Sequence, residues 1–198
     1  MMKKESLDMA KNTFEIEAKV ILDTAAGMDW DEFAKAVKLL SRAQRTAVSG
    51  CGHSGIACRH FAHSLCCIER PARFLSPAEA IHGATGFLQS GDVLVLASRG
   101  GKTSELMPII DIAKKKGAFI ISVTENTTSP MAKQSDVTLP LKVYCEADRY
   151  DTQGTSSFVA VTAVFDALQI AVMEETGYRG EQFALIHPGG AVGERLNK

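Results

Sequence analysis

Two short segments typical of strands each lead directly into a glycine-rich turn and then into a segment with helical spacing. Residues 93–97 (VLVLA) precede Ser98-Arg99-Gly100-Gly101-Lys102-Thr103, and residues 46–50 (TAVSG) precede Cys51-Gly52-His53-Ser54-Gly55. An unbroken apolar run of this length is typical of a strand that is buried on both faces of a sheet. Strand, tight turn and helix in this order predict an α/β fold.

The same alternation extends along most of the chain. Apolar spacing predicts helices at residues 3–26, 30–40, 76–80 and 181–185 and a long helix ending near 175, and further strands at residues 73–75, 118–123 and 137–141. Strands and helices that alternate at this interval predict a parallel sheet with right-handed crossovers. We therefore expect one domain over residues 1–198, a three-layer α/β sandwich with a five-stranded parallel sheet. Residues 1–44 would form an N-terminal extension of two helices.

The charge balance argues against two classes of partner. The chain has 22 Lys and Arg residues against 23 Asp and Glu residues, a formal net charge of -1. Nothing in this balance favours binding to a nucleic acid or to an anionic membrane. No apolar run approaches membrane-spanning length, and the N-terminus lacks the apolar core of a signal peptide. We expect a cytoplasmic protein.

The cysteines raise the question of disulfides and metals. There are five, an odd number, which argues against a disulfide framework. Four of them share a stretch with three histidines: Cys51, Cys58, Cys66, Cys67, His53, His60 and His63. No Cys-x-x-Cys pair is matched by a second one at zinc-ligand spacing. We expect inert, buried thiols, and neither a metal nor a cofactor.

The two glycine-rich turns are candidates for an anion site. Glycine permits backbone angles that a Cβ obstructs, and the first N–H groups of a helix lack intrahelical partners. Phosphate binds at such helix starts. The same residue types cap ordinary helices, so each turn alone leaves both interpretations open. In an open parallel sheet, however, the turns after the strands meet at one edge, which favours phosphate binding.

Three segments and the C-terminal tail resemble a known family. The segments are residues 50–55, 98–105 and 155–157, and the tail is residues 183–193 (FALIHPGGAVG). The segments are similar to the sugar isomerase (SIS) domain, a flavodoxin-like fold that binds phosphosugars. The tail closely resembles the end of the isomerase domain in arabinose-5-phosphate isomerases. The resemblance covers most of the chain.

The resemblance implies reversible conversion of an aldose phosphate into a ketose phosphate through an enediol, for example arabinose 5-phosphate into ribulose 5-phosphate. It also implies a homodimer or homotetramer with sites at subunit boundaries. The family's phosphate-binding positions fall on Gly52, Ser54, Ser98, Gly101, Thr103 and Ser157. Its candidate acid and base positions fall on His53, His82, Glu105, Glu146 and His187. Carboxylates and imidazoles serve such proton transfers when burial and neighbours bring their pKa values near neutrality.

Each acid or base candidate also has an ordinary structural interpretation. Glu146, the preferred base, lies in a fairly apolar segment, yet a glutamate at the end of a strand is commonly a solvated loop acid. Glu105 falls in a first helical turn, where a carboxylate suits the helix dipole. His187 precedes a Pro-Gly-Gly turn that holds the backbone extended, and His82 follows a short helix.

Two positions depart from the family pattern. His53 stands where the family loop Gly-x-Gly-Lys-Ser has lysine, and Gly100 stands where Ser-x-Ser-Gly has its second serine. The first change removes a fixed cation and the second a phosphate donor, for which Arg99 or Lys102 would supply charge instead. The family often continues into a pair of nucleotide-sensing CBS modules. Because this chain stops at Lys198, we expect no such regulation within it.

Other functions remain open on the sequence. An isomerase of hexose 6-phosphates and 3-hexuloses is a near relative of the leading hypothesis. A SIS domain that binds a phosphosugar without turnover would be a sensor, as in transcription regulators, although the chain has no basic helix-turn-helix segment. A nucleotide-binding Rossmann domain matches the glycine spacing of residues 50–55, but no acidic residue closes the next strand near Phe74.

Overall fold

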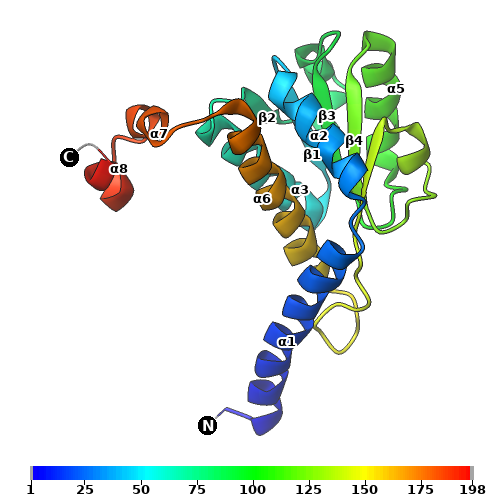
Figure 1. The fold of residues 1–198 in the computed structure, drawn as a ribbon. Helices are drawn as coiled ribbons and strands as arrows, with labels where there is room; N and C mark the ends of the chain where they lie inside the picture. Colours follow the sequence, from blue (N-terminus) through cyan, green and yellow to red (C-terminus); the bar gives the residue numbers. More distant parts are fainter. Residues whose placement is uncertain (1, 197–198) are drawn as a thin grey trace.

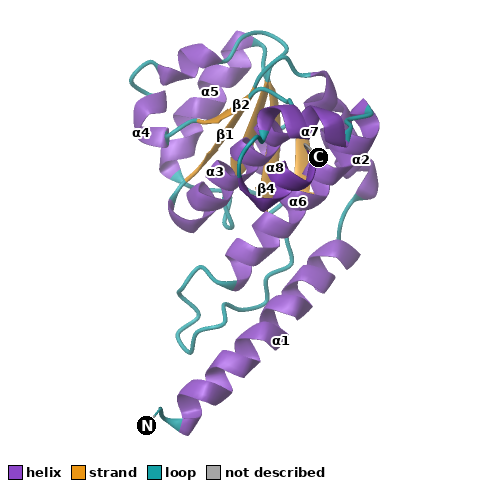
Figure 2. Ribbon diagram, turned by 90° about the vertical axis from the view of Figure 1, so that its left-hand side faces the viewer, coloured by secondary structure: helices purple, strands orange, loops and turns teal. Residues whose placement is uncertain are grey.

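The computed structural model describes residues 2–196, so Met1 and residues 197–198 of the predicted domain lie outside the described residues. Its centre is a parallel sheet in the order β2-β1-β3-β4-β5, with helices on both faces (Figures 1 and 2). The strands are β1 (Thr46–Gly50), β2 (Ala72–Phe74), β3 (Val93–Ala97), β4 (Phe119–Thr124) and β5 (Val137–Pro140). The predicted α/β sandwich with a five-stranded parallel sheet is confirmed.

Helices cover both faces of the sheet in two layers, and others extend beyond these layers (Figure 1). They are α1 (Lys4–Ala26), α2 (Trp30–Arg42), α3 (Gly52–Cys67), α4 (Pro77–Ala80), α5 (Met107–Lys116), α6 (Ser156–Thr176), α7 (Gly180–Ile186) and α8 (Gly190–Leu196), with 3-10 turns η1 (Ala84–Phe87), η2 (Ser104–Leu106) and η3 (Ala132–Gln134). Val95 of β3 packs with α2, α3 and α6, whereas Leu94 and Leu96 pack with α4, η1 and α5. Successive side chains along β3 point to opposite faces of the sheet, so the sheet has a separate hydrophobic core on each face.

The long helix α6 organises the first of these cores. It contacts α1, α2 and α3, and its Phe165 stacks on Phe61 of α3 with ring centroids 4.3 Å apart. Both rings are fully buried, and each buried ring contributes about 1.5–3 kcal/mol of apolar transfer free energy. Within residues 2–196, α6 is the one helix whose length and composition would suit a membrane span, a test that core helices also pass. The expectation that no apolar run approaches that length is therefore wrong for α6.

The carboxyl ends of the central strands lie level with one another. Gly50 at the end of β1 pairs with Ala97 at the end of β3, and Ala97 pairs with Val123 of β4. The strand order reverses between β1 and β3, so the turns that follow these two strands lead away from each other. In open α/β sheets the ligand crevice lies outside the strand ends at such a reversal.

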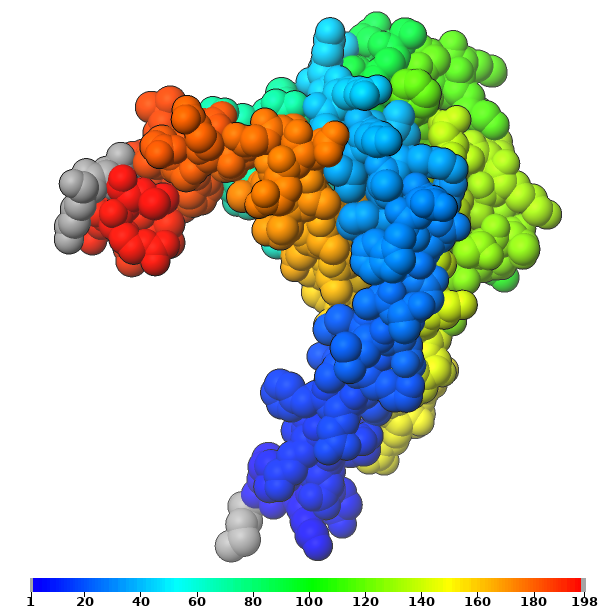
Figure 3. All heavy atoms as spheres, in the orientation of Figure 1, coloured from blue at the N-terminus to red at the C-terminus, as the bar shows by residue number. Residues whose placement is uncertain are grey.

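Two helical segments project from the body of the molecule (Figures 1 and 3). One is α1, 23 residues long, of which Val20 and Thr24 are buried. The other is the pair α7 and α8, called here the C-terminal arm. The 21 residues of α6 span roughly 30 Å at the usual helical rise. The arm therefore starts far from the sheet edge at which α6 begins.

The structure differs from the sequence prediction at two helices. The segment after β3 does not become α-helical directly, because η2 comes first and α5 begins at Met107, with Pro108 in its first turn. Proline is well accommodated there. The second difference is α8, which the sequence prediction omits. Its seven residues include two glycines and one alanine, so they carry little of the apolar periodicity that reveals a helix.

Candidate functional site

A hollow of about 330 Å³ opens where α3 begins. It is lined by Gly50, Cys51, Gly52, Gly55, Ile56, Arg59, Phe74, Ser76, Pro77, Ala78 and Glu105. A Cβ on Gly55 would come 2.6 Å from the carbonyl oxygen of Gly50, so glycine lets α3 start directly against the end of β1. The first turn of α3 has no acidic residue and no side-chain cap. Its free N–H groups and the helix dipole favour an anion at this position.

The turn after β3 holds two of the predicted phosphate ligands together. The hydroxyls of Ser98 and Thr103 are hydrogen-bonded at 2.8 Å, and the Gly101 N–H donates to Ser98 Oγ at 3.2 Å. Gly101 has a left-handed φ of +63°, and a Cβ there would overlap Ser129 Oγ. Thr103 precedes η2 without a side-chain capping bond. The hydroxyls therefore line the turn and do not cap a helix.

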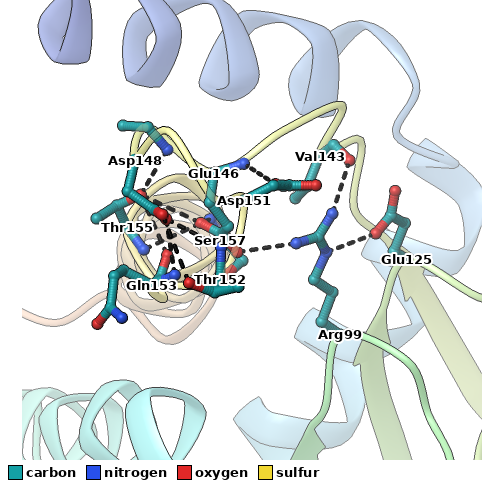
Figure 4. Close-up of polar contacts among 11 residues, drawn as sticks. Arg99, Glu125, Val143, Glu146, Asp148, Asp151, Thr152, Gln153, Thr155 and Ser157 are labelled. Carbon is teal, nitrogen blue, oxygen red and sulfur yellow. Dashed lines mark hydrogen bonds and ion pairs between the residues drawn. The ribbon is translucent and has the colours of Figure 1, made fainter. Parts of the chain in front are cut away.

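Glu146 lies at the centre of a hydrogen-bond network at the start of α6 (Figure 4). Its Oε2 accepts the N–H groups of Thr155 at 3.0 Å and Ser157 at 3.1 Å, and the Thr155 hydroxyl at 3.2 Å. Its Oε1 accepts from Arg99 Nη1 at 2.9 Å. The sequence predicts an apolar setting, but the buried carboxylate is surrounded by donors. In this structure it acts as an N-terminal cap of α6.

Arg99 donates hydrogen bonds to three acceptors of the protein. Besides Glu146, it donates from Nε to Glu125 at 2.8 Å and from Nη2 to the Val143 carbonyl at 3.3 Å (Figure 4). Burial alone would lower the pKa of Arg99, but the hydrogen bond and charge of Glu125, with the charge of Glu146, raise it. These contacts argue against Arg99 as a phosphate ligand. The exposed Lys102 is the better placed cation of this turn.

Glu105 lines the hollow and is exposed. Its carboxylate accepts a hydrogen bond from the Ser104 hydroxyl at 2.8 Å. Its own backbone N–H and this hydroxyl hold the pKa of Glu105 below the ordinary value. The group is therefore ionised at neutral pH and ready to accept a proton, although it is a weaker base than a carboxylate tuned toward neutrality.

The three predicted histidines lie in different parts of the molecule. His53 is in the first turn of α3, beside Gly154 and Phe158. His82 is exposed in the turn after α4. His187 lies in the C-terminal arm, where its Nδ1 is buried without a hydrogen-bond partner among the described residues. Because the arm extends away from the sheet (Figure 1), one chain alone does not bring His187 to the hollow.

The sequence prediction omits Arg59 and Phe74, which also line the hollow. The Arg59 guanidinium lies 3.9 Å from the centre of the Phe74 ring, a cation–π contact that holds the cation in place. The signal was present in the sequence, because Gly52, Ile56 and Arg59 recur at the helical spacing that places residues on one face.

The five cysteines are free thiols, and the expectation that they are buried is wrong for most of them. Only Cys58 is buried, whereas Cys66 is exposed and Cys51, Cys67 and Cys145 are partly exposed. Burial raises the pKa of Cys58, whose Sγ donates to the Ser49 carbonyl, and burial also raises the pKa of Cys51 in the hollow. A thiol with a raised pKa is a poor nucleophile at neutral pH. Residues 2–196 contain no cluster of three or more His, Cys, Asp or Glu side chains that would hold a metal ion.

Comparison with known proteins finds close relatives of this arrangement. The chain is 37% identical to the arabinose 5-phosphate isomerase KdsD of Pseudomonas aeruginosa, over 94% of this chain and 57% of that protein. It thus spans little more than half the length of the curated relatives that it matches. Among solved structures, a Listeria monocytogenes protein described as a candidate sugar-phosphate isomerase has a TM-score of 0.91 and 40% identity, covering 96% of this chain and 100% of that one. An Escherichia coli CFT073 protein in complex with arabinose 5-phosphate has a TM-score of 0.86 and 28% identity, covering 95% of this chain and 100% of that one.

A family model also matches the part of the chain that forms the site. The SIS domain matches residues 39–171, more than half of the chain. This segment contains the whole sheet, both glycine-rich turns and the Glu146 network. The chain therefore belongs to the SIS domain family.

Proposed function

We propose that this chain is a phosphosugar aldose–ketose isomerase acting on a pair such as arabinose 5-phosphate and ribulose 5-phosphate. One observation carries the proposal. The uncapped start of α3 and the hydroxyl-lined turn after β3 lie at the carboxyl ends of neighbouring strands, beside a hollow that Glu105 lines. Curated relatives at 30–37% identity are named arabinose 5-phosphate isomerases. The sugar itself is part of the proposal.

In this proposal the phosphate group orients the sugar. It would accept hydrogen bonds from the hydroxyls of Ser98 and Thr103 and from the first turn of α3, which includes Gly52 and Ser54. Gly101 shapes the turn, and Ser157 contributes its hydroxyl because its N–H is already held by Glu146. Binding energy gained far from the reacting carbons then stabilises the transition state by fixing the geometry.

The isomerisation needs a base that takes a proton from a sugar carbon, and an acid and a base that move a proton between the sugar oxygens. We assign the base to Glu105, because it is exposed to the hollow. Glu146 accepts four hydrogen bonds from the protein, three at Oε2 and one at Oε1, so the protein already holds both of its oxygens. Its part in the mechanism is therefore to hold the start of α6. His53 and His82 are the candidates for shuttling a proton between the sugar oxygens.

We also propose that the chain assembles into a homodimer or homotetramer with sites at subunit boundaries. The projecting segments support this, since Phe14 and Leu22 of α1 and Leu185 of the arm are large apolar side chains that are 69–78% exposed. Such exposure commonly marks an interface. His187 of the partner subunit would then serve the site of its neighbour.

Three further expectations belong to the same proposal. The chain would be one domain, with residues 1–44 as an extension. Its five free thiols suit the reducing cytoplasm. With a net charge of -1 we expect neither a nucleic acid nor a membrane as partner. The reaction as proposed moves protons only and calls for no cofactor.

The test is proton exchange in deuterated water. Incubation of arabinose 5-phosphate with the protein should exchange the hydrogen at C2, which is followed by NMR. Glu105→Gln should slow this exchange by about 10²–10⁴-fold, whereas Asp111→Asn, an exposed carboxylate on α5, should not slow it. If the wild-type protein exchanges no proton on any pentose or hexose phosphate in a panel, it is not such an isomerase.

A sensor that binds phosphosugars without turnover is the second candidate. Two observations favour it: the Glu146 carboxylate is already held by four hydrogen bonds from the protein, and the pKa of Glu105 is lowered. Saturable binding of a sugar phosphate by calorimetry, without exchange at carbon, would identify a sensor. Binding together with exchange identifies the isomerase.

A further inference from the structure

The His53 side chain packs against Gly154, a residue without a side chain. The ring faces Gly154 in the loop before α6. A Cβ built on Gly154 would lie 2.8 Å from both Cγ and Nδ1 of His53 and 3.0 Å from its Cβ. These atoms lie close to the backbone of His53, so they cannot move aside as the end of a flexible side chain could. An alanine at position 154 therefore cannot be accommodated by a small movement of the ring edge.

Glycine is required at this position for space and not for backbone freedom. Gly154 is absent from the residues with positive φ in the described chain, so alanine suits its backbone conformation. A second contact comes from the same segment, because the ring of Phe158 lies 6.3 Å from that of His53 at an interplanar angle of 75°. This edge-to-face geometry is favourable for aromatic pairs. Two residues of one segment thus define where the imidazole stands.

That segment is itself fixed to the phosphate-binding turn. Thr155, next to Gly154, donates its N–H to Glu146, and Glu146 pairs with Arg99. Arg99 follows Ser98 in the turn after β3. The neighbour of Gly154 is therefore linked to the turn that carries the phosphate ligands through Glu146 and Arg99 (Figure 4).

We propose that Gly154 is a positioning residue that, with Phe158, holds the His53 imidazole in one orientation at the first turn of α3, and so helps to select the sugar phosphate. This inference rests on the proposed function for the role of His53 toward the sugar. An imidazole is short and planar, so its place depends on what packs against it, whereas a long lysine chain reaches a ligand by its own rotamers. Displacing the ring changes which sugar oxygen it reaches.

The first experiment needs no ligand. In NMR spectra of the full chain, nuclear Overhauser contacts between the His53 and Phe158 rings should be present in the wild type and lost in Gly154→Ala. Gly86→Ala is the matched control, because Gly86 has a backbone without positive φ and open space around its Cβ position. Contacts that persist in Gly154→Ala would overturn the inference.

The second experiment uses arabinose 5-phosphate as the probe. Gly154→Ala should raise its dissociation constant about tenfold, as expected for one lost hydrogen bond to a charged group. In a His53→Ala background, which removes the contacts with Cγ and Nδ1 and leaves the one at 3.0 Å with Cβ, Gly154→Ala should change that constant by less than about twofold. An equal loss of affinity in both backgrounds would show a general loop effect and overturn the inference. Absence of binding to the wild type would instead overturn the proposed function, and the ring contacts would still decide whether Gly154 positions His53.

Discussion

The Nη1 atom of Arg99 lies 2.9 Å from Oε1 of Glu146, and this ion pair joins the turn after β3 to the first turn of α6 (Figure 4). Glu146 passes the connection on through the N–H groups of Thr155 and Ser157. Two turns assigned to ligand binding are thereby held in one geometry. The pair is a scaffold for the site, because both side chains are also held by other groups of the protein.

Removal of the arginine should destabilise the fold. Arg99→Gln leaves the carboxylate of Glu146, 4% exposed, without its cation, while the arginine itself is 34% exposed. We expect a loss of about 1–3 kcal/mol in the free energy of unfolding, smaller than for a fully buried pair because water screens the arginine. Urea unfolding measures the loss. Lys102→Gln in the same exposed turn is the control and should stay within about 0.5 kcal/mol.

A double-mutant cycle separates the pair from its surroundings. Because Arg99 and Glu146 are in direct contact, the loss in Arg99→Gln/Glu146→Gln should be smaller than the sum of the two single losses. Additive losses in urea unfolding would mean that the two side chains act independently, contrary to the coupling described above.

The loop before α6 should loosen in acid. The Asp148 carboxylate accepts the N–H groups of Gln153, Tyr150 and Thr152, and these bonds, that from Gln153 first, lower the pKa of Asp148. A folded pKa below the unfolded one means that this stabilisation is complete above about pH 4 and disappears as the pH falls through the folded value. The amide shifts of these three residues should titrate with a midpoint below about 3.9, the value of an unperturbed aspartate.

The control for this titration is Asp148→Asn, whose three amide shifts should show no such step. A midpoint at or above the ordinary aspartate value in the wild type would contradict the assignment of these hydrogen bonds.

The ring stack between α3 and α6 should be a main source of stability. Phe165 is fully buried, so Phe165→Ala should lower the free energy of unfolding by about 3–5 kcal/mol through lost contacts and a cavity. Ile170 on the same helix is 57% exposed, and Ile170→Ala should cost no more than about 0.5 kcal/mol. Similar losses for both variants in denaturant unfolding would show that the stack has no special weight.

The exposed face of α1 should matter for assembly. Phe14 is 78% exposed, and Phe14→Asp places a charge on the face that we expect to pack against a second copy. The wild type should sediment as a dimer or tetramer at micromolar concentration, and Phe14→Asp should shift it toward smaller species. Lys11→Ala on the same exposed helix is the control. A wild-type monomer would contradict the proposed assembly.

The sheet and most of its helices were predictable because their signals are local. Runs such as residues 93–97 are apolar without interruption since both faces of β3 are buried, and β4 begins and ends within one residue of the predicted strand. The tail helix α8 was not predictable, because its glycines give no apolar stripe. The 3-10 turn before α5 was missed because a strand, turn and helix pattern does not distinguish the first helical turn from η2.

The site was only partly predictable, because its decisive contacts are distant in sequence. Apolar neighbours of Glu146 suggested an apolar setting, but its cation is Arg99, 47 positions away. Arg59 was partly predictable. Its helical spacing from Gly52 is visible in the sequence, whereas its contact with the Phe74 ring is not. Local patterns therefore located the turns, and only the folded chain indicates what each side chain contacts.

The crowding between Gly101 and Ser129 has a consequence for anyone who varies this turn. A library that randomises residues 98–103 while leaving position 129 unchanged would return almost nothing but glycine at 101, since any methyl group there collides with the serine hydroxyl. Replacing Ser129 alone would not open position 101 to other residues, because the left-handed φ of +63° still disfavours any side chain with a Cβ.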